Sequence, residues 1–225
     1  MKPDLIIYHG SQQIVEVPKF GIGKTYNDYG QGFYCTEHME LAKEWACTFE
    51  SSGFANKYAL NLEGLKILDL GSSQYTILHW LALLVANRQF AKKTPLLQLG
   101  AKWLLENYLL DLAPYDIVRG YRADDSYFAF ARAFLSNQIS LEQLQSAMQL
   151  GKLGEQIVLK TPKAFSQIKF LESIPADNIF YYIKRQVRDE QARQAYADIL
   201  TQNSLQGIYI RDLMKAQVKS NGTRL

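Results

Sequence analysis

The feature that most constrains the fold is an alternation of short apolar strands with helical segments along most of the chain. The runs LIIYHG (residues 5–10) and GFYC (residues 32–35) have the composition of short buried strands. Apolar residues then recur at four-residue spacing after Thr36, which is typical of a helix with a threonine N-cap. This alternation predicts an α+β protein.

The remaining elements follow from the same periodicities. Further strands are expected at residues 58–62, 65–70, 115–120, 155–161 and 168–174, the first two across a tight turn at Glu63 and Gly64. Helices are expected at residues 75–113 in two segments, at 123–135, at 141–150 between Ser140 and Gly151, and at 183–202. Strand patterns end near residue 176, so we expect a domain over residues 1–176 and a helical C-terminal extension over 177–225, packed on the same domain.

Composition excludes several classes of protein. The chain has 225 residues, 48% hydrophobic and 21% charged, which is enough to bury one full core. Its longest apolar run, residues 76–86, is shorter than a bilayer span and carries His79, so no membrane partner is expected. The net charge of +3 gives little support to nucleic acid as a partner, although the basic tail leaves that alternative open.

The two cysteines indicate the compartment. Cys35 and Cys47 have neither metal-ligand spacing nor the pattern of a disulfide framework. They are interpreted as small buried hydrophobic residues of a protein in a reducing cytoplasm, and no metal site is expected.

Three short motifs occur in a characteristic order: YHGS at residues 8–11, GFYCT at 32–36 and GEQIVLKT at 154–161. They resemble the three signature strands of the ADP-ribosyltransferase superfamily, in the branch of diphtheria toxin and the poly-ADP-ribose polymerases. That branch carries His-Gly, Tyr and Glu on these strands, where this chain has His9, Tyr34 and Gln156. With Asn87-Arg88, YDIVRG and ADD, the chain is similar to a bacterial family of unknown-function domains grouped with these transferases, over about residues 5–172.

The resemblance implies a split antiparallel sheet pair flanked by helices, with NAD bound between. His9 would contact a ribose hydroxyl and Tyr34 would stack on nicotinamide, while Phe33, on the opposite face of its strand, would pack in the core. The residues implied to bind NAD are His9, Gly10, Ser11, Tyr34, Thr36 and Arg88. For Arg88 an alternative stays open, because a cation at a helix C-terminus also complements the helix dipole.

Gln156 departs from the family pattern, because it can form the hydrogen bond of the usual Glu but carries no negative charge. Candidates for a substitute acid are Glu155, Asp124 and Asp125. Strand alternation points Glu155 to the other face, unless the regular strand begins after it. We therefore favour Asp125 as the third catalytic residue beside His9 and Gln156. Its alternative role is that of a helix cap.

Two functions remain. The first is an NAD-dependent mono-ADP-ribosyltransferase, a bacterial or phage toxin or effector that modifies a protein or nucleic-acid acceptor, with an antitoxin or other partner protein. The second is a non-catalytic module on the same fold that binds a nucleotide or a partner. A nuclease has little support, because the three histidines form no paired constellation in the sequence.

Overall fold

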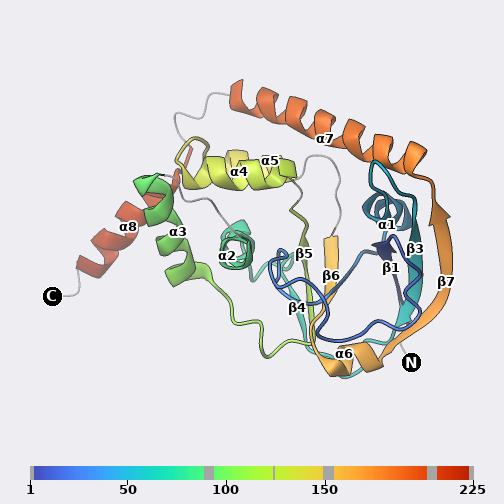
Figure 1. Ribbon diagram of the computed structural model, residues 1–225. Coiled ribbons are helices and arrows are strands. Elements are labelled where there is room, and N and C mark those ends of the chain that lie inside the picture. Colours follow the sequence, from blue (N-terminus) through green and yellow to red (C-terminus); the bar gives the residue numbers. More distant parts are fainter. Residues whose placement is uncertain (1–2, 89–93, 124, 149–154, 202–206, 223–225) are drawn as a thin grey trace.

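Two sheets form the centre of the computed structural model, which describes residues 3–88, 94–123, 125–148, 155–201 and 207–222 (Figure 1). The first sheet has the order β1 (Leu5–Ser11), β3 (Gly53–Leu60), β7 (Ile168–Ala176), and the second the order β2 (Phe33–Cys35), β6 (Glu155–Leu159), β5 (Ile117–Tyr121), β4 (Ile67–Asp69). Neighbouring strands are antiparallel except β4 and β5, which are parallel. The expected split pair is present, but one strand pair departs from the antiparallel arrangement.

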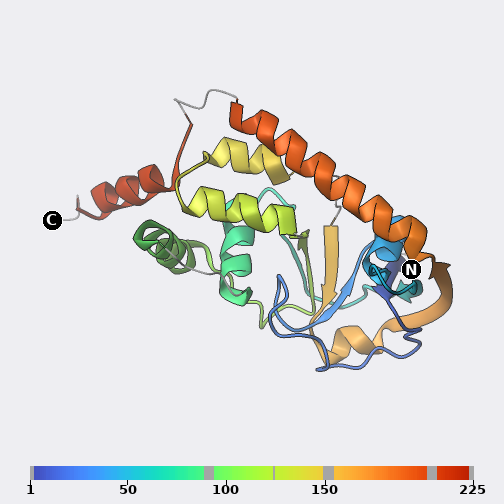
Figure 2. The ribbon, with the colours of Figure 1, turned by 45° about the horizontal axis from the view of Figure 1, so that its top comes forward.

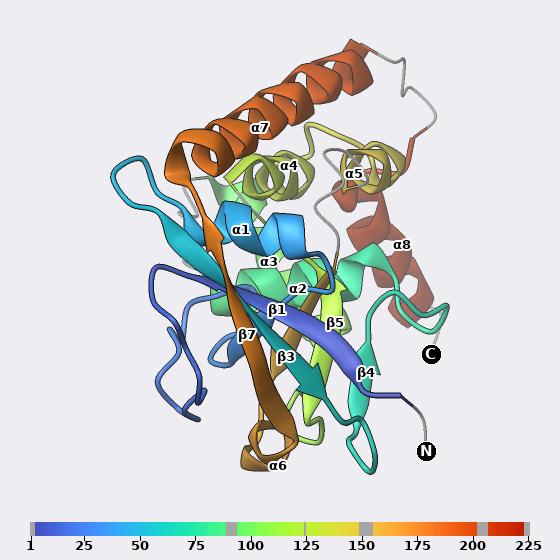
Figure 3. The same ribbon diagram turned by 90° about the vertical axis from the view of Figure 1, so that its right-hand side faces the viewer.

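The two sheets meet where β1 passes β2. The amide of Tyr8 donates to the carbonyl of Thr36 at 2.8 Å, and the amide of Thr36 donates back to Tyr8 at 3.0 Å. This bridge brings β1 beside β2, which in turn pairs with β6. Figure 3 shows the molecule from the side of the first sheet, with β1, β3 and β7 in front of β5 and β4. The bridge also corrects the predicted N-cap: Thr36 is held in extended backbone by β1, and helix α1 (Met39–Ala46) begins after His38.

The turn at Gly64 is present, with a φ of 69°, but the strands around it do not pair with each other. β3 joins the first sheet, whereas β4 pairs with β5 in the second. The amides of Asp116 and Ile117 both donate to the carbonyl of Lys66, which ties the start of β4 to β5. A turn glycine therefore redirects the chain from one sheet to the other.

Helices cover the second sheet on one face and cross above both sheets (Figures 1 and 2). Their bounds are α2 (Ile77–Asn87), α3 (Pro95–Tyr108), α4 (Asp125–Leu135), α5 (Leu141–Met148), α6 (Pro162–Ser166), α7 (Asn178–Thr201) and α8 (Ile210–Gly222). The predicted break in the segment 75–113 is confirmed, although its last five residues are not helical. Helix α7 begins at Asn178, earlier than expected, and packs on α1, α4 and α5.

The largest apolar cluster lies between α2, α3, α4, α5 and the second sheet, and α2 contributes the fully buried Trp80, Leu81 and Leu84. Ser140 is confirmed as a cap of α5, since its hydroxyl accepts from the amide of Gln143 at 3.2 Å. Gly151, the expected stop of that helix, lies outside the described residues. Among the helices described, none combines the length and the apolar character that crossing a bilayer requires.

Candidate functional site

A cavity of about 620 Å³ opens where β1, β2 and β6 meet. Its wall comes from these strands, the loop 12–32, α1, and the residues that follow α2 and β5. His9, Tyr34 and Gln156 all line it. The structure therefore brings together, from three neighbouring strands, the three residues that the sequence motifs singled out.

One ring nitrogen of His9 forms a hydrogen bond to the backbone, and this bond fixes the tautomer of the imidazole. Its Nδ1 lies 2.7 Å from the carbonyl oxygen of Tyr34, and because a carbonyl only accepts, Nδ1 must carry the proton. Burial lowers the pKa of His9, although the bond to Tyr34 acts in the opposite direction, so the imidazole is neutral at pH 7. Its Nε2 is then a hydrogen-bond acceptor. The neighbouring Gly10 also lines the cavity, and a Cβ there would overlap the backbone of α1 at Ala42.

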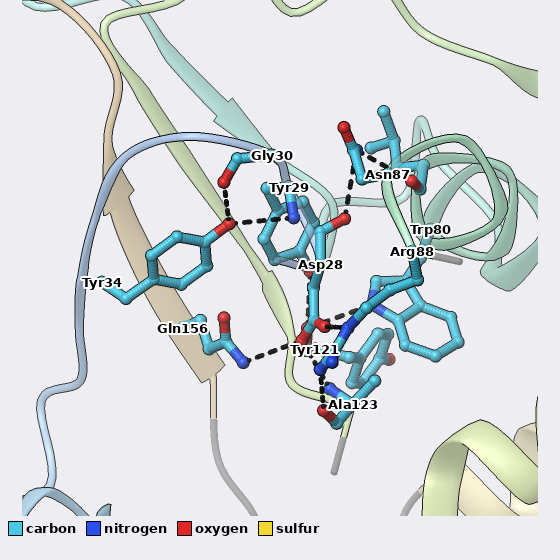
Figure 4. Close-up of polar contacts among 11 residues, drawn as sticks. Asp28, Tyr29, Gly30, Tyr34, Trp80, Asn87, Arg88, Tyr121, Ala123 and Gln156 are labelled. Carbon is cyan, nitrogen blue, oxygen red and sulfur yellow. Dashed lines mark hydrogen bonds and ion pairs between the residues drawn. The ribbon is translucent and has the colours of Figure 1, made fainter. Parts of the chain in front are cut away.

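Tyr34 contributes its ring to the cavity and uses its hydroxyl to hold a loop (Figure 4). The hydroxyl donates to the carbonyl of Gly30 at 2.6 Å and accepts from the amide of Tyr29 at 3.1 Å. Gly30 has a φ of 72°, a conformation that favours glycine. The glycine and aromatic residues of DYGQGFYCT therefore close a turn against the strand that follows it.

Phe33 packs in the second apolar cluster, as expected, but it also lines the cavity. Its ring centroid lies 4.3 Å from that of His9. The prediction that Phe33 would pack in the core is therefore correct but incomplete, because Phe33 reaches the cavity as well. The cavity lies at the junction of the two sheets, so it is reached from both faces of β2.

The side-chain amide of Gln156 is buried, and within the described residues only its nitrogen forms a hydrogen bond. Only 5% of the residue is exposed, and its Nε2 donates to Oδ2 of Asp28 at 3.1 Å. A carboxylate can only accept, so this bond fixes which way the amide is turned. The other atom, Oε1, is buried and has no hydrogen-bond partner in the described part of the chain. Gln156 thus presents an unpaired acceptor at the cavity.

Asp28 is a site residue that the sequence motifs missed. It is 3% exposed, and it accepts from Nε of Arg88 at 2.7 Å and from the amide of Ala123 at 2.9 Å, besides the bond from Gln156 (Figure 4). Arg88 also donates to the carbonyl of Ala123 at 3.1 Å. The available signal was an acid directly before a turn rich in glycine and aromatic residues. Arg88 is at once the C-cap residue of α2 and a wall of the cavity.

Two residues implied to bind NAD lie elsewhere. Ser11 and Thr36 are not among the residues that line the cavity. The hydroxyl of Ser11 accepts from the amide of Gln13 at 3.1 Å, and Thr36 is fully buried in the bridge between β1 and β2. The hydroxyl of Ser11 thus serves a local turn, whereas Thr36 serves the sheet junction through its backbone and accepts from the amide of His38 through its hydroxyl.

Of the three candidate acids, the described residues test only Glu155. Glu155 starts β6 and contacts Arg119 on β5, and it does not line the cavity. The objection from strand alternation therefore holds. Asp124 and the side chain of Asp125 lie outside the described residues, so the role proposed for Asp125 stays a prediction. Among the described residues, the carboxylate that meets Gln156 is that of Asp28.

The cavity also has cationic walls. Besides Arg88, its lining includes Lys19 and Lys24 from the loop 12–32 and Arg122 directly after β5. None of the last three was singled out by a motif. Within the described ranges, no group of three or more histidine, cysteine, aspartate or glutamate side chains could hold a metal ion.

Fold and site together define an α+β protein with a cavity that combines polar acceptors and cations at a junction of two sheets. A family model described as "Protein of unknown function (DUF3990)" matches residues 5–170, so the chain belongs to this family. No curated protein and no solved structure matches the chain.

Proposed function

We propose that the chain is an NAD-dependent mono-ADP-ribosyltransferase that modifies a macromolecular acceptor. The observation that carries the proposal is the meeting of His9, Tyr34 and Gln156 in one cavity, from three adjacent strands. These are the positions at which the sequence resembles the His, Tyr and Glu signature of that superfamily. The superfamily assignment, like the activity, is part of the proposal.

The free atoms of the site suit a bound ribose. In the reaction the bond between C1′ and nicotinamide breaks, nicotinamide leaves with the electron pair, and an acceptor nucleophile bonds to C1′ while its proton passes to solvent. Nε2 of His9 and Oε1 of Gln156 are both acceptors, so each can take a hydrogen bond from a ribose hydroxyl. The ring of Tyr34 offers an aromatic face to nicotinamide.

The charge of the site differs from that of a site with a catalytic Glu. Gln156 is neutral, and among the described residues the carboxylate that meets it is that of Asp28, which accepts from its amide nitrogen at 3.1 Å. Asp28 polarises this amide, but Arg88 offsets much of its charge. Less negative charge then faces the cationic C1′ centre, so we expect slower transfer than a direct carboxylate would support.

Nicotinamide release from NAD by the purified protein is the first test. His9→Ala and Gln156→Ala should each reduce release by about tenfold or more, because each removes a hydrogen bond that orients the reacting ribose. Glu155→Gln is the matched control, since its side chain contacts Arg119 and not the cavity. Absence of release with protein and with nucleic-acid acceptors would contradict the transferase.

A non-catalytic binding module is the second candidate, favoured by the neutral Gln156 and by the pairing of Asp28 with Arg88. Calorimetry separates it from the transferase: NAD bound with no nicotinamide released supports the module. We extend the first proposal to a bacterial or phage toxin or effector in the cytoplasm, controlled by a partner protein. Growth arrest by the wild type and not by His9→Ala would support that role.

A further inference from the structure

The indole of Trp45 presents a second unpaired polar group to the cavity. Trp45 lies on α1 and lines the cavity, and its Nε1 is buried with no hydrogen-bond partner among the described residues. A buried donor without a partner costs free energy, so proteins rarely keep one. In a cavity wall, such a donor indicates an acceptor atom on a ligand.

Arg122 lies directly on this indole. The centre of its guanidinium is 4.3 Å from the centroid of the Trp45 ring, which is the geometry of a cation–π stack. Arg122 follows β5, whose last carbonyl, that of Tyr121, accepts from the hydroxyl of Tyr29 at 2.6 Å and from Nε1 of Trp80 at 3.0 Å. The backbone next to Arg122 is thus fixed, and the contact with the indole holds the guanidinium at this wall.

The charge of the lining favours an anion. Among the lining residues that the structure describes, four side chains are cationic and one is a carboxylate, so the formal sum is 4 − 1 = +3 with His9 neutral. The cations are Lys19, Lys24, Arg88 and Arg122, and the carboxylate is Asp28. A phosphate complements this excess of cationic side chains and matches the planar guanidinium of arginine.

We propose that Trp45 and Arg122 form a phosphate-binding subsite of the cavity. The indole Nε1–H donates to a phosphate oxygen, and the stacked guanidinium of Arg122 pairs with the same phosphate. The ligand class is an organic diphosphate that also carries a sugar for His9 and Gln156. In this form the inference rests on the proposed function, where the phosphate belongs to the diphosphate of NAD.

Binding of inorganic pyrophosphate and of ADP-ribose, measured by calorimetry, tests the subsite. Trp45→Phe keeps a ring and removes only the N–H, and it should weaken both ligands about tenfold, as expected for one hydrogen bond to a charged group. Arg122→Gln should weaken them at least as much and reduce the dependence of affinity on salt. Lys57→Gln is the control, because Lys57 pairs with Glu172 outside the cavity.

A purely structural role predicts different results. Because the indole N–H has no protein partner in the described ranges, Trp45→Phe should leave the melting temperature of the free protein nearly unchanged. A loss of affinity without a loss of stability supports the subsite. Wild-type protein that binds neither ligand, or Trp45→Phe and Arg122→Gln proteins that bind both like the wild type, overturns it.

The subsite and the transferase can fail separately. Pyrophosphate binding that depends on Trp45 and Arg122, with no nicotinamide released from NAD, supports the subsite and contradicts the transferase. Nicotinamide release with ADP-ribose affinity unchanged in both variants supports the transferase and overturns the subsite.

Discussion

Two arginines of the protein pair with buried carboxylates, and the two pairs are built differently. Asp28 pairs with Arg88 beside Gln156, and Glu44 on α1 pairs with Arg188 on α7. Both carboxylate side chains are 3% exposed. Asp28, however, also accepts from a backbone amide and a side-chain amide, whereas Nε and Nη1 of Arg188 have no hydrogen-bond partner within the described residues.

The difference shows what each pair does for the molecule. A buried ion pair stabilises a fold only where further hydrogen bonds compensate the lost water. Asp28 meets this condition and orients Gln156 and Arg88 in the cavity wall. Burial raises the pKa of Glu44 although the adjacent Arg188 acts to lower it. The loss of hydration is therefore less well compensated in this pair than in the pair of Asp28 and Arg88. We infer that the first pair determines the shape of the site and the second joins α7 to α1.

Substituting each carboxylate by its amide is the strongest test of this comparison. Asp28→Asn should destabilise the fold by about 3 kcal/mol, because either orientation of the new amide sets a donor against Arg88, Gln156 or the backbone amide of Ala123. Glu44→Gln should cost only about 1 kcal/mol, since its carbonyl still accepts from Arg188 and burial of a charge is relieved. Urea unfolding of both variants measures the two costs, and equal costs would break the comparison.

Gln156→Glu comes next in expected size. The substitution adds the negative charge that the usual Glu carries. In this protein, however, it sets a second carboxylate against that of Asp28, whose Oδ2 lies 3.1 Å from the present amide nitrogen of Gln156. One of the two must then bind a proton or move apart. We expect a loss of stability of about 2 kcal/mol and no gain in nicotinamide release. A variant that releases nicotinamide faster at unchanged stability would show that Asp28 does not control this position.

The pH dependence of stability should have opposite signs in the two regions. His9 has a lowered pKa, so below its ordinary value of 6.5 the unfolded chain binds the proton first and stability falls as the pH falls. Glu44 has a raised pKa, so above its ordinary value of 4.5 the folded protein keeps the proton longer and stability falls as the pH rises through its folded pKa. His9→Asn should remove the first slope and Glu44→Gln the second, as measured by urea unfolding in steps from pH 4 to pH 8. Persistence of both slopes in both variants would refute the assignment.

Tyr34→Phe should give the smallest effect. It removes the hydroxyl that joins the carbonyl of Gly30 to the amide of Tyr29, at a cost of about 1 kcal/mol, and it keeps the ring in the cavity. Affinity for NAD should change little, whereas Tyr34→Ala should lose a stacking contact of about 1 kcal/mol as well. If the Tyr34→Phe and Tyr34→Ala proteins both fold and bind NAD with equal affinity, the ring of Tyr34 does not contact NAD.

The sequence predicted those parts of the molecule that depend on local pattern. Periodicity located β1, β2 and α2, and the cap at Ser140 could be read from its hydroxyl and the following residues. The predicted cap at Thr36 was wrong because a distant strand, through Tyr8, uses its backbone. Such pairing is decided by contacts between residues that are far apart in the chain.

The sequence alone determined an α+β chain with His9, Tyr34 and Gln156 on short strands, since side-chain periodicity and turn glycines are local properties. Only the tertiary structure decided that Asp28, more than a hundred residues before Gln156, binds its amide and leaves its oxygen to the cavity. It also decided that Trp45 and Arg122 stack on the same wall. A buried acid and an unpaired donor have no signature in a sequence, because burial and hydrogen bonding depend on which distant segments pack around them.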